Sequence, residues 1–486
     1  MRMASVVVVG GLFAGVVLGE EDFEQNPLQH KIRASVSVDF SREIGPLRTD
    51  IVGINEGPTL HGADARRQQM ADLREMGIKS VRLHDIPLTN PGQKLVDVQD
   101  IFPVWSESAD PRDERSYFFE QTDDYLKTII ECGVDEIVYR LGTSIEWTSP
   151  RQYFAKCPKD MSRYAEICAG IVRHYTKAAW ANGFDAHVTH WEIWNEPNLK
   201  GAMWDKDTEA YLSFYATVAK RLKTEFPDIR VGGPAYTGLD RPFLEHMVEF
   251  CKKMDAPVDF ISWHGYLVTP DGGKWCLKYI RDWRKWLDDR GMKNCQLIYD
   301  EWHYFPCTWT DLASPQGRRR WQRDAADGMH GIDSAAFITL CYTRWQDVPV
   351  DRTHFYMFTG PDWGLYDPEG EAYTTLDAFK LWRRFSDGIN LRVAVGDFDN
   401  YGVVAGIAEN GMHRILVSDF RPGESNMESD RKISLKGAKR NGAAVVQILD
   451  AGSRRPRTVT VTFSDGVIRL PSKVVSGSAI YLVEFM

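Results

Sequence analysis

The sequence lacks the excess of positive charge that nucleic-acid-binding surfaces need. Lysine and arginine number 59 against 68 aspartate and glutamate residues, which gives a net charge of −9. Phosphate backbones are bound by basic surfaces. We therefore expect no nucleic-acid partner, and a neutral ligand fits the composition better.

The sequence also lacks the signatures of cofactor and metal sites. Gly53 and Gly57 flank Asn55 but form no complete dinucleotide-binding or phosphate-binding loop. The eight cysteines show no C-x2-C spacing of a zinc site. No cofactor and no metal site are predicted. The cysteines could form disulfides in an exported chain, and their pairing is left open.

A long apolar run occurs only at the beginning of the chain. Residues 4–19 follow Arg2 and carry no charge, and small residues stand at Val17 and Gly19, where cleavage would occur. This pattern is typical of an export signal. A membrane-spanning helix would need about 20 apolar residues. We predict a signal peptide over residues 1–19 and an exported protein, periplasmic or extracellular, with an uncleaved anchor as the alternative.

Aromatic residues, by contrast, are abundant. The chain has 16 Trp, 19 Tyr and 23 Phe. Sugar rings stack on aromatic faces, but barrel cores also use aromatics, so composition alone leaves both interpretations open. The 486 residues exceed what one core usually serves, and we expect two domains.

Between residues 45 and 387, short β-rich runs alternate with amphipathic helical segments. The helical spacing is clearest from Tyr211 through Tyr215 to Leu222, after Asp207 as a possible N-cap. The predicted strands are 51–55, 78–84, 134–141, 187–196, 229–234, 258–264, 295–301 and 353–359. Eight such repeats predict an α/β fold, a (β/α)8 TIM barrel with its active site at the C-terminal strand ends.

The helical signal ends after about residue 388, and residues 388–486 are predicted to form a β-sandwich. Two hairpins are expected, because Asn-Gly and Asp-Gly turns accept positive φ at low cost. They join 403–408 to 413–417 through Asn410-Gly411, and 459–463 to 467–470 through Asp465-Gly466. A strand from residues 30–44 is predicted to join this domain.

The most informative motif is His190-Trp191-Glu192-Ile193-Trp194-Asn195-Glu196-Pro197-Asn198. Pro197 cannot donate to a sheet, so Glu196 should lie at the rim of the barrel. Strand alternation predicts that Glu192, Trp194 and Glu196 project to one side and Asn195 to the other, unless a bulge brings both neighbours to the pocket.

A second glutamate ends the seventh predicted strand. Glu301 closes the run Gln296-Leu297-Ile298-Tyr299-Asp300-Glu301 and should face Glu196 across the barrel mouth. Glycoside cleavage with retention needs two carboxyl groups about 5 to 5.5 Å apart, and inversion needs about 6.5 to 9.5 Å. Strands four and seven of a barrel can supply the shorter gap, so the two glutamates predict a glycosidase.

These residues carry a resemblance to a known family. Asn195-Glu196-Pro197 with Glu301 resembles the retaining glycosidases whose catalytic carboxylates lie on barrel strands four and seven. Within them the chain is most similar to glycoside hydrolase family 39, the family of β-xylosidases and α-L-iduronidase. Residues 77–84 and the run Ser262-Trp263-His264-Gly265-Tyr266 support this, and the resemblance spans roughly residues 30–486.

The resemblance implies a role for each matching residue. Glu196 would protonate the departing oxygen and later activate water, and Glu301 would form the glycosyl-enzyme. Asn195 would hold the sugar 2-hydroxyl. His84 and His264 would contact the sugar.

One position departs from the pattern of the iduronidases. Tyr266 stands where they have, as we align them, a lysine that meets the uronate carboxylate, and a tyrosine is uncharged at neutral pH. We therefore predict a neutral sugar such as xylose or arabinose, in a β-xyloside-like or arabinoside-like substrate. The alternatives are a uronate-specific glycosidase, a transglycosidase and a non-catalytic carbohydrate-binding protein.

Other residues near the two glutamates have expected roles as well. Trp302 and Trp363 are candidate sugar platforms, with wall packing as the alternative. Arg82 is expected to support a nearby carboxylate. Glu192 and Asp300 lie further back on their strands, which favours ion-pair or barrel-core roles.

Overall fold

The computed structural model describes most of the chain. The described residues are 35–59, 62–84, 94–144, 155–176, 184, 187–238, 241–267, 270–307, 311, 314–321, 328–360, 362–396, 401–422, 431–471 and 477–486. The predicted export signal, residues 1–19, lies outside them. None of the helices in the described part combines the length and apolar character that a membrane crossing requires.

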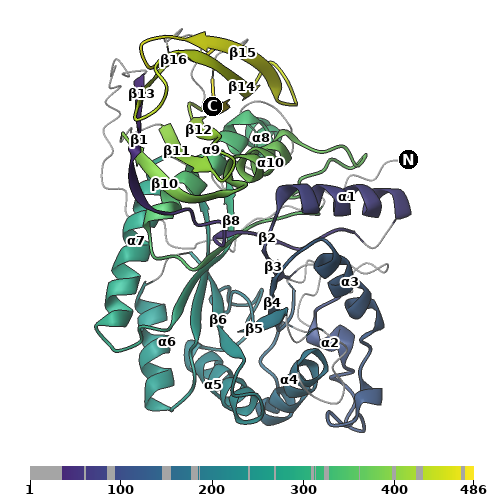
Figure 1. Ribbon diagram of the computed structural model, residues 1–486. Helices are drawn as coiled ribbons and strands as arrows, with labels where there is room; N and C mark the ends of the chain where they lie inside the picture. Colours follow the sequence, from purple (N-terminus) through teal and green to yellow (C-terminus); the bar gives the residue numbers. More distant parts are fainter. Residues whose placement is uncertain are drawn as a thin grey trace.

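The predicted (β/α)8 barrel is confirmed. Eight parallel strands pair in sequence order, and β9 returns to β2 to close the barrel (Figure 1). The strands are β2 (Val52–Asn55), β3 (Ser80–Leu83), β4 (Glu136–Leu141), β5 (Val188–Ile193), β6 (Arg230–Thr237), β7 (Phe260–Leu267), β8 (Gln296–Tyr304) and β9 (Arg352–Phe355). Each overlaps one of the eight predicted strands.

The helices around the barrel follow from their apolar spacing. In α5, Tyr211, Phe214 and Tyr215 are buried on one face, and the Asp207 carboxylate caps the helix by accepting from the Ala210 N–H. Figure 1 shows α4, α5 and α6 on the side of the barrel opposite the C-terminal sheet. The helices are α1 (Ala63–Met76), α2 (Val98–Ile101), α3 (Glu120–Glu131), α4 (Met161–Tyr175), α5 (Thr208–Glu225), α6 (Arg241–Lys253), α7 (Pro270–Asp288), α8 (Pro315–Trp321), α9 (Ile332–Arg344) and α10 (Thr374–Ser386).

The second domain is one continuous sheet that includes the N-terminal strand β1. Its order is β15-β14-β17-β12-β11-β10-β1-β13-β16, and the end strands β15 and β16 contact each other. The curled sheet thereby encloses its own core, which contains Val38, Ile415 and Val483. The strands are β1 (Ser35–Pro46), β10 (Ile389–Val395), β11 (Tyr401–Ala408), β12 (His413–Asp419), β13 (Lys432–Lys436), β14 (Gly442–Asp450), β15 (Arg457–Phe463), β16 (Val467–Arg469) and β17 (Ala479–Phe485).

One of the two predicted hairpins is shorter than predicted. β11 and β12 pair across Asn410-Gly411 as predicted. The turn at Asp465-Gly466 also exists, with φ of 54° and 71°, and one antiparallel bridge between Ser464 and Val467 closes it. Beyond this bridge β15 pairs with β14 and β16 pairs with β13. Turn residues determine where the chain reverses, not which strands pair. This turn carries the chain from one end of the sheet to the other.

All eight cysteines lie in the described part of the chain, none of them forms a disulfide there, and seven are buried. The disulfides that an exported chain would permit are therefore not formed.

The sheet domain packs on the barrel through α9 and α10, which both contact β12 and β17. Glu484 on β17 accepts a hydrogen bond of 2.7 Å from Arg384 on α10. On β11, a Cβ at Gly402 would lie 2.3 Å from Oγ1 of Thr343 and 3.0 Å from Cα of Leu340 on α9. Glycine at this position therefore permits the close approach of sheet and helix.

We expect Gly402→Ala to lower the free energy of unfolding by about 1–3 kcal/mol, because the added methyl group must displace α9. Urea unfolding followed by tryptophan fluorescence measures the change. Gly442→Ala is the matched control, since a Cβ there would meet only the ring of Phe463, at 3.1 Å. Equal destabilisation by both substitutions would contradict the role of Gly402.

Candidate active site

The chain leaves the barrel after β5 through residues with a left-handed backbone. β5 ends at Ile193, and Trp194 and Glu196 have φ of 75° and 45°. Trp194 turns outward and packs against Trp204, whereas Asn195 and Glu196 both reach polar side chains inside the barrel. The predicted alternation, which put Trp194 on the side of Glu196, is wrong because regular strand geometry ends at Ile193.

A β-bulge in β8 brings two consecutive acidic residues into the barrel. Trp263 of β7 pairs with Tyr299, but the next residue, His264, pairs with Glu301, so that Asp300 is the extra residue. A bulge breaks the alternation of side chains along a strand. Asp300 and Glu301 consequently both face the interior, where they contact the same buried arginine.

The two strand-end glutamates meet at His264. Its Nδ1 lies 2.8 Å from Oε1 of Glu196 and 3.2 Å from Oε2 of Glu301. One carboxylate oxygen of each glutamate and one ring nitrogen of His264 all lie within 4.8 Å of one another. The side chains of Glu196 and Glu301 are 14% and 8% exposed, whereas that of His264 is fully buried. The two carboxylates are thus close enough to act on one bound molecule.

Arg82 on β3 organises the floor of this cluster. Its side chain is fully buried, and its N–H groups contact side chains from β2, from β8, and from β5 and the turn after it. The predicted contact between Arg82 and a carboxylate is present. Glu192 and Asp300, which lie earlier on their strands than Glu196 and Glu301, form ion pairs with Arg82, as predicted. The contacts are Asn55 at 3.1 Å, Glu192 at 2.8 Å, Asn195 at 2.7 Å, Asp300 at 3.3 Å and Glu301 at 3.3 Å.

Tyr266 contacts the second oxygen of Glu301. Its hydroxyl donates a hydrogen bond to Oε1, while Arg82 donates to Oε2. The partly exposed Trp363 packs against Tyr266, with ring centroids 5.0 Å apart. Trp363 therefore packs on a residue that contacts Glu301, and its role as a sugar platform stays a prediction.

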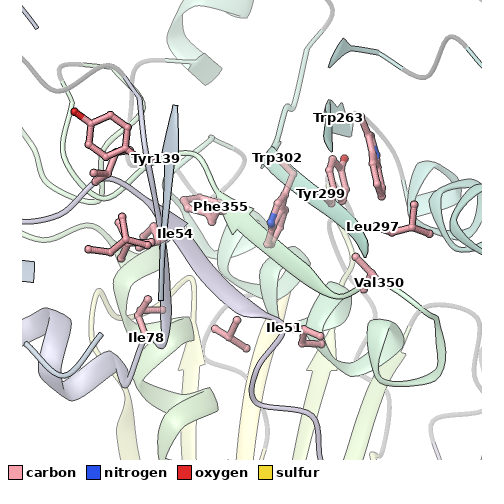
Figure 2. Packing of buried hydrophobic residues seen from close by; sticks show 14 of the residues in the cluster. Ile51, Ile54, Ile78, Tyr139, Trp263, Leu297, Tyr299, Trp302, Val350 and Phe355 are labelled. Atoms are coloured by element: carbon pink, nitrogen blue, oxygen red, sulfur yellow. The ribbon is translucent and has the colours of Figure 1, made fainter. Parts of the chain in front are cut away.

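Trp302 faces away from the site, although it follows Glu301 directly. It is fully buried, and its ring lies 4.7 Å from that of Trp345 and 5.3 Å from that of Phe355. Figure 2 shows it in a packed layer with Phe355 and Tyr299. The interpretation of Trp302 as a sugar platform is wrong, because the residue after the bulge points into the outer layer of the barrel.

A second buried ion pair lies at the ends of β3 and β4. Arg140 pairs with Asp97, and its Nε donates to Nδ1 of His84 at 3.2 Å. Because an arginine only donates, His84 accepts at Nδ1 and carries its proton on Nε2. Sequence analysis missed Arg140 and Asp97. An arginine at a predicted strand end is nevertheless the same signal that singled out Arg82.

Burial and neighbouring charges shift the pKa values of this cluster. Burial raises the pKa of Glu301 to about 7, and the charge of Glu196 adds to the shift. Burial lowers the pKa of His264, but the charges of Glu301 and Asp300 outweigh it and raise that pKa to about 10. Burial would raise the pKa of Asp300, but Arg82 and His264 hold it well below its usual value. The neighbouring carboxylates therefore favour the imidazolium form of His264 at neutral pH.

The same three residues, Glu196, His264 and Glu301, have the spacing of a metal site. A histidine binds metal through a neutral ring. Because the neighbouring carboxylates raise the pKa of His264 to about 10, a metal ion at this place would have to displace a proton from Nδ1. The absence of a metal site stays a prediction.

Comparison with known proteins gives relatives among the glycosidases. The model of the family described as Glycosyl hydrolases family 39 matches residues 31–311. A Beta-xylosidase of Caldicellulosiruptor saccharolyticus is 35% identical over 324 residues, 62% of this chain and 62% of that protein. A Beta-xylosidase of Geobacillus stearothermophilus is 30% identical over 109 residues, 22% of this chain and 21% of that protein. The chain thus aligns with about three fifths and about a fifth of the lengths of these relatives.

Among solved structures, a glucosidase from Croceicoccus marinus has a TM-score of 0.70 at 20% identity, covering 93% of this chain and 98% of that chain. This likeness shows that the fold recurs as a whole. The family match covers more than half of the sequence and includes both glutamates. The chain therefore belongs to family 39 of the glycosyl hydrolases.

Proposed function

We propose that this protein is a retaining glycosidase that removes a terminal neutral pentose, of the β-xyloside type, from an oligosaccharide or polysaccharide. The observation that carries the proposal is the separation of the two carboxylates, whose oxygens lie within 4.8 Å. Retention goes with a gap of about 5 to 5.5 Å between carboxyl groups, and inversion with about 6.5 to 9.5 Å. The short gap leaves no room for the water that inversion requires.

The surroundings of the two glutamates assign their roles. Glu301 receives hydrogen bonds from Tyr266 and Arg82, which stabilise the anion that a nucleophile must be. Glu196 is the more exposed of the two and lies in the turn beyond β5. Glu196 thus protonates the departing oxygen while Glu301 attacks the anomeric carbon. Glu196 then takes a proton from the water that hydrolyses the ester.

Asn195 is oriented for the sugar by Arg82. Its Oδ1 accepts a hydrogen bond of 2.7 Å from the guanidinium, which leaves the amide NH2 to donate to a sugar hydroxyl. The contact fixes which end of the amide faces the substrate. This supports the role that the family resemblance gives to Asn195.

Charge in the described part of the site favours a neutral sugar. Arg82 and Arg140 each face a carboxylate already, and Tyr266 donates a hydroxyl rather than a positive charge. A uronate would bring a further carboxylate beside Glu196 and Glu301. A pentose brings none, and both relatives named above are called Beta-xylosidase.

Replacing each glutamate by alanine tests the two roles. We expect Glu301→Ala to lower kcat/KM for an aryl β-xyloside by about 10⁴-fold or more, because the nucleophile is lost. Added azide then enters from the vacated side and gives the inverted α-xylosyl azide. With Glu196→Ala, azide instead opens the glycosyl-enzyme and gives the retained β-xylosyl azide. Proton NMR of the products reads the anomeric configuration.

The exposed glutamate Glu107 provides the control for this experiment. Glu107→Ala should keep wild-type activity and give no azide product. An inverted first product from the wild-type enzyme, or full activity in Glu301→Ala, would refute the mechanism. Activity on an iduronide but not on a xyloside would refute the choice of sugar.

The pH profile provides a second test, because the pKa of Glu301 is raised to about 7 by burial and by the charge of Glu196. A protonated Glu301 cannot attack, so kcat/KM should fall as the pH drops below that value. Tyr266→Phe removes a donor to the anion and should move this acidic limb to higher pH by about 0.5 to 1 unit. Tyr299→Phe is the control, since that hydroxyl donates to the carbonyl of Gly265. If the acidic limb of the pH profile is the same in Tyr266→Phe as in the wild type, the hydrogen bond from Tyr266 does not stabilise the Glu301 anion.

A further inference from the structure

Asp300 is a buried carboxylate that the proposed mechanism does not use. The bulge in β8 turns it into the barrel, where its side chain has no exposed surface. Its Oδ2 lies 3.3 Å from Nε of Arg82 and 3.7 Å from Nε2 of His264. An ionised carboxylate in such a place must have a partner with which it interacts strongly.

His264 is enclosed by carboxylates on both sides of its ring. Nδ1 lies 2.8 Å from Glu196 and 3.2 Å from Glu301, and Nε2 faces Asp300. At Nδ1 the ring is within hydrogen-bond distance of a carboxylate, whereas the 3.7 Å between Nε2 and Asp300 is too long for a hydrogen bond, so Asp300 acts on the ring through its charge. In the described part of the chain, the other titratable groups around His264 and Asp300 include Arg82 on β3, Glu192 on β5, Tyr266 on β7, Tyr299 on β8 and His354 on β9.

We propose that Asp300 is a positioning residue that keeps His264 a permanent imidazolium, whose Nδ1–H pairs with whichever of Glu196 and Glu301 is ionised. The inference rests on the proposed function, in which the two glutamates exchange charge. It adds a fixed cation between them and a buried anion behind that cation.

The charge exchange explains what such a cation does. When Glu301 attacks the anomeric carbon, its charge is consumed in the ester. In the same step the proton of Glu196 passes to the leaving oxygen and leaves Glu196 ionised. The negative charge thus moves between two groups that His264 contacts simultaneously, at 2.8 and 3.2 Å. Hydrolysis of the ester reverses the movement, while His264 keeps both protons throughout.

Asp300 is needed because burial opposes a charged ring. Removal from water lowers the pKa of a histidine, and the carboxylates of Glu301 and Asp300 reverse this shift for His264. The charge of Glu301 disappears in the glycosyl-enzyme, whereas that of Asp300 persists. Asp300 therefore keeps the ring charged in both halves of the reaction.

Glu192 provides a matched comparison. It is also fully buried and contacts Arg82 at 2.8 Å, and its carboxyl group interacts with Arg82 and Asp300 rather than with His264. Above the pKa of Glu192, which burial raises to about 8, replacing Glu192 or Asp300 by its amide removes the same kind of charge from the same arginine. Only the substitution at Asp300 also removes the anion that faces Nε2 of His264.

The experiment is a titration of the full-length protein labelled with ¹⁵N-histidine, with His264→Gln identifying the ring signals of His264. We expect wild-type His264 to stay an imidazolium up to about pH 9. In Asp300→Asn it should lose a proton at a pH lower by about 2 units or more, while Glu192→Gln changes the titration by less than about 0.5 unit. A neutral wild-type His264 at neutral pH, or equal shifts in both variants, would overturn the inference.

Kinetics separates this inference from the proposed function. In Asp300→Asn, kcat for an aryl β-xyloside should fall about tenfold per pH unit above the new titration point of His264, with little change in KM. The ring titration needs no turnover, so it decides the charge of His264 even if no glycoside is cleaved. An active enzyme with a neutral His264 would overturn the inference and leave the proposed function intact. If Asp300→Asn does not fold, the wild-type titration still decides whether the permanent imidazolium exists.

Discussion

The guanidinium of Arg82 is the interaction on which the site depends. It lies inside the barrel without exposed surface and contacts Glu192, Asp300 and Glu301, which come from two separate strands. A buried charge is tolerated only when it is paired, and removing one member of such a pair costs about 3–5 kcal/mol. The same arginine orients Asn195 through a hydrogen bond. One side chain therefore couples the closure of the barrel to the position of the nucleophile and of a sugar-binding amide.

The cluster contains more acids than bases, and this has a thermodynamic consequence. Burial raises the pKa of Glu192 to about 8 and that of Glu301 to about 7. Between the usual carboxyl pKa and these values, the folded protein binds more protons than the unfolded chain. The stabilisation from these groups is therefore complete at low pH and is lost as the pH rises through their folded pKa values. The ionised form of Glu301 that catalysis needs therefore lowers the free energy of unfolding near neutral pH. Active sites commonly trade stability for activity in this way.

The sequence was sufficient to predict the barrel and its two principal glutamates. Strand-helix alternation located all eight strands because strands buried by surrounding helices have a strong apolar pattern. Pairing between distant strands was harder to predict. The turn at Asp465-Gly466 was recognised from its residues, yet the partners of β15 and β16 depend on how the whole sheet curls. Arg140 was overlooked because its partner Asp97 lies in none of the predicted strands, so that nothing in the sequence marked the pair.

The errors at the site have one physical origin, the irregular backbone at two strand ends. Neither tryptophan nor glutamate favours positive φ, yet Trp194 and Glu196 adopt it. Such a conformation costs of order 1–3 kcal/mol and persists only where the surrounding structure holds it. Here the ring of Trp194 packs against Trp204 outside the barrel, while Glu196 contacts His264 inside it. The bulge at Asp300 likewise depends on pairing with a neighbouring strand. The side chains of Glu196, Asp300 and Glu301 thus point into the barrel because of contacts that form only in the assembled barrel. The alternation of side chains along a regular strand cannot predict this.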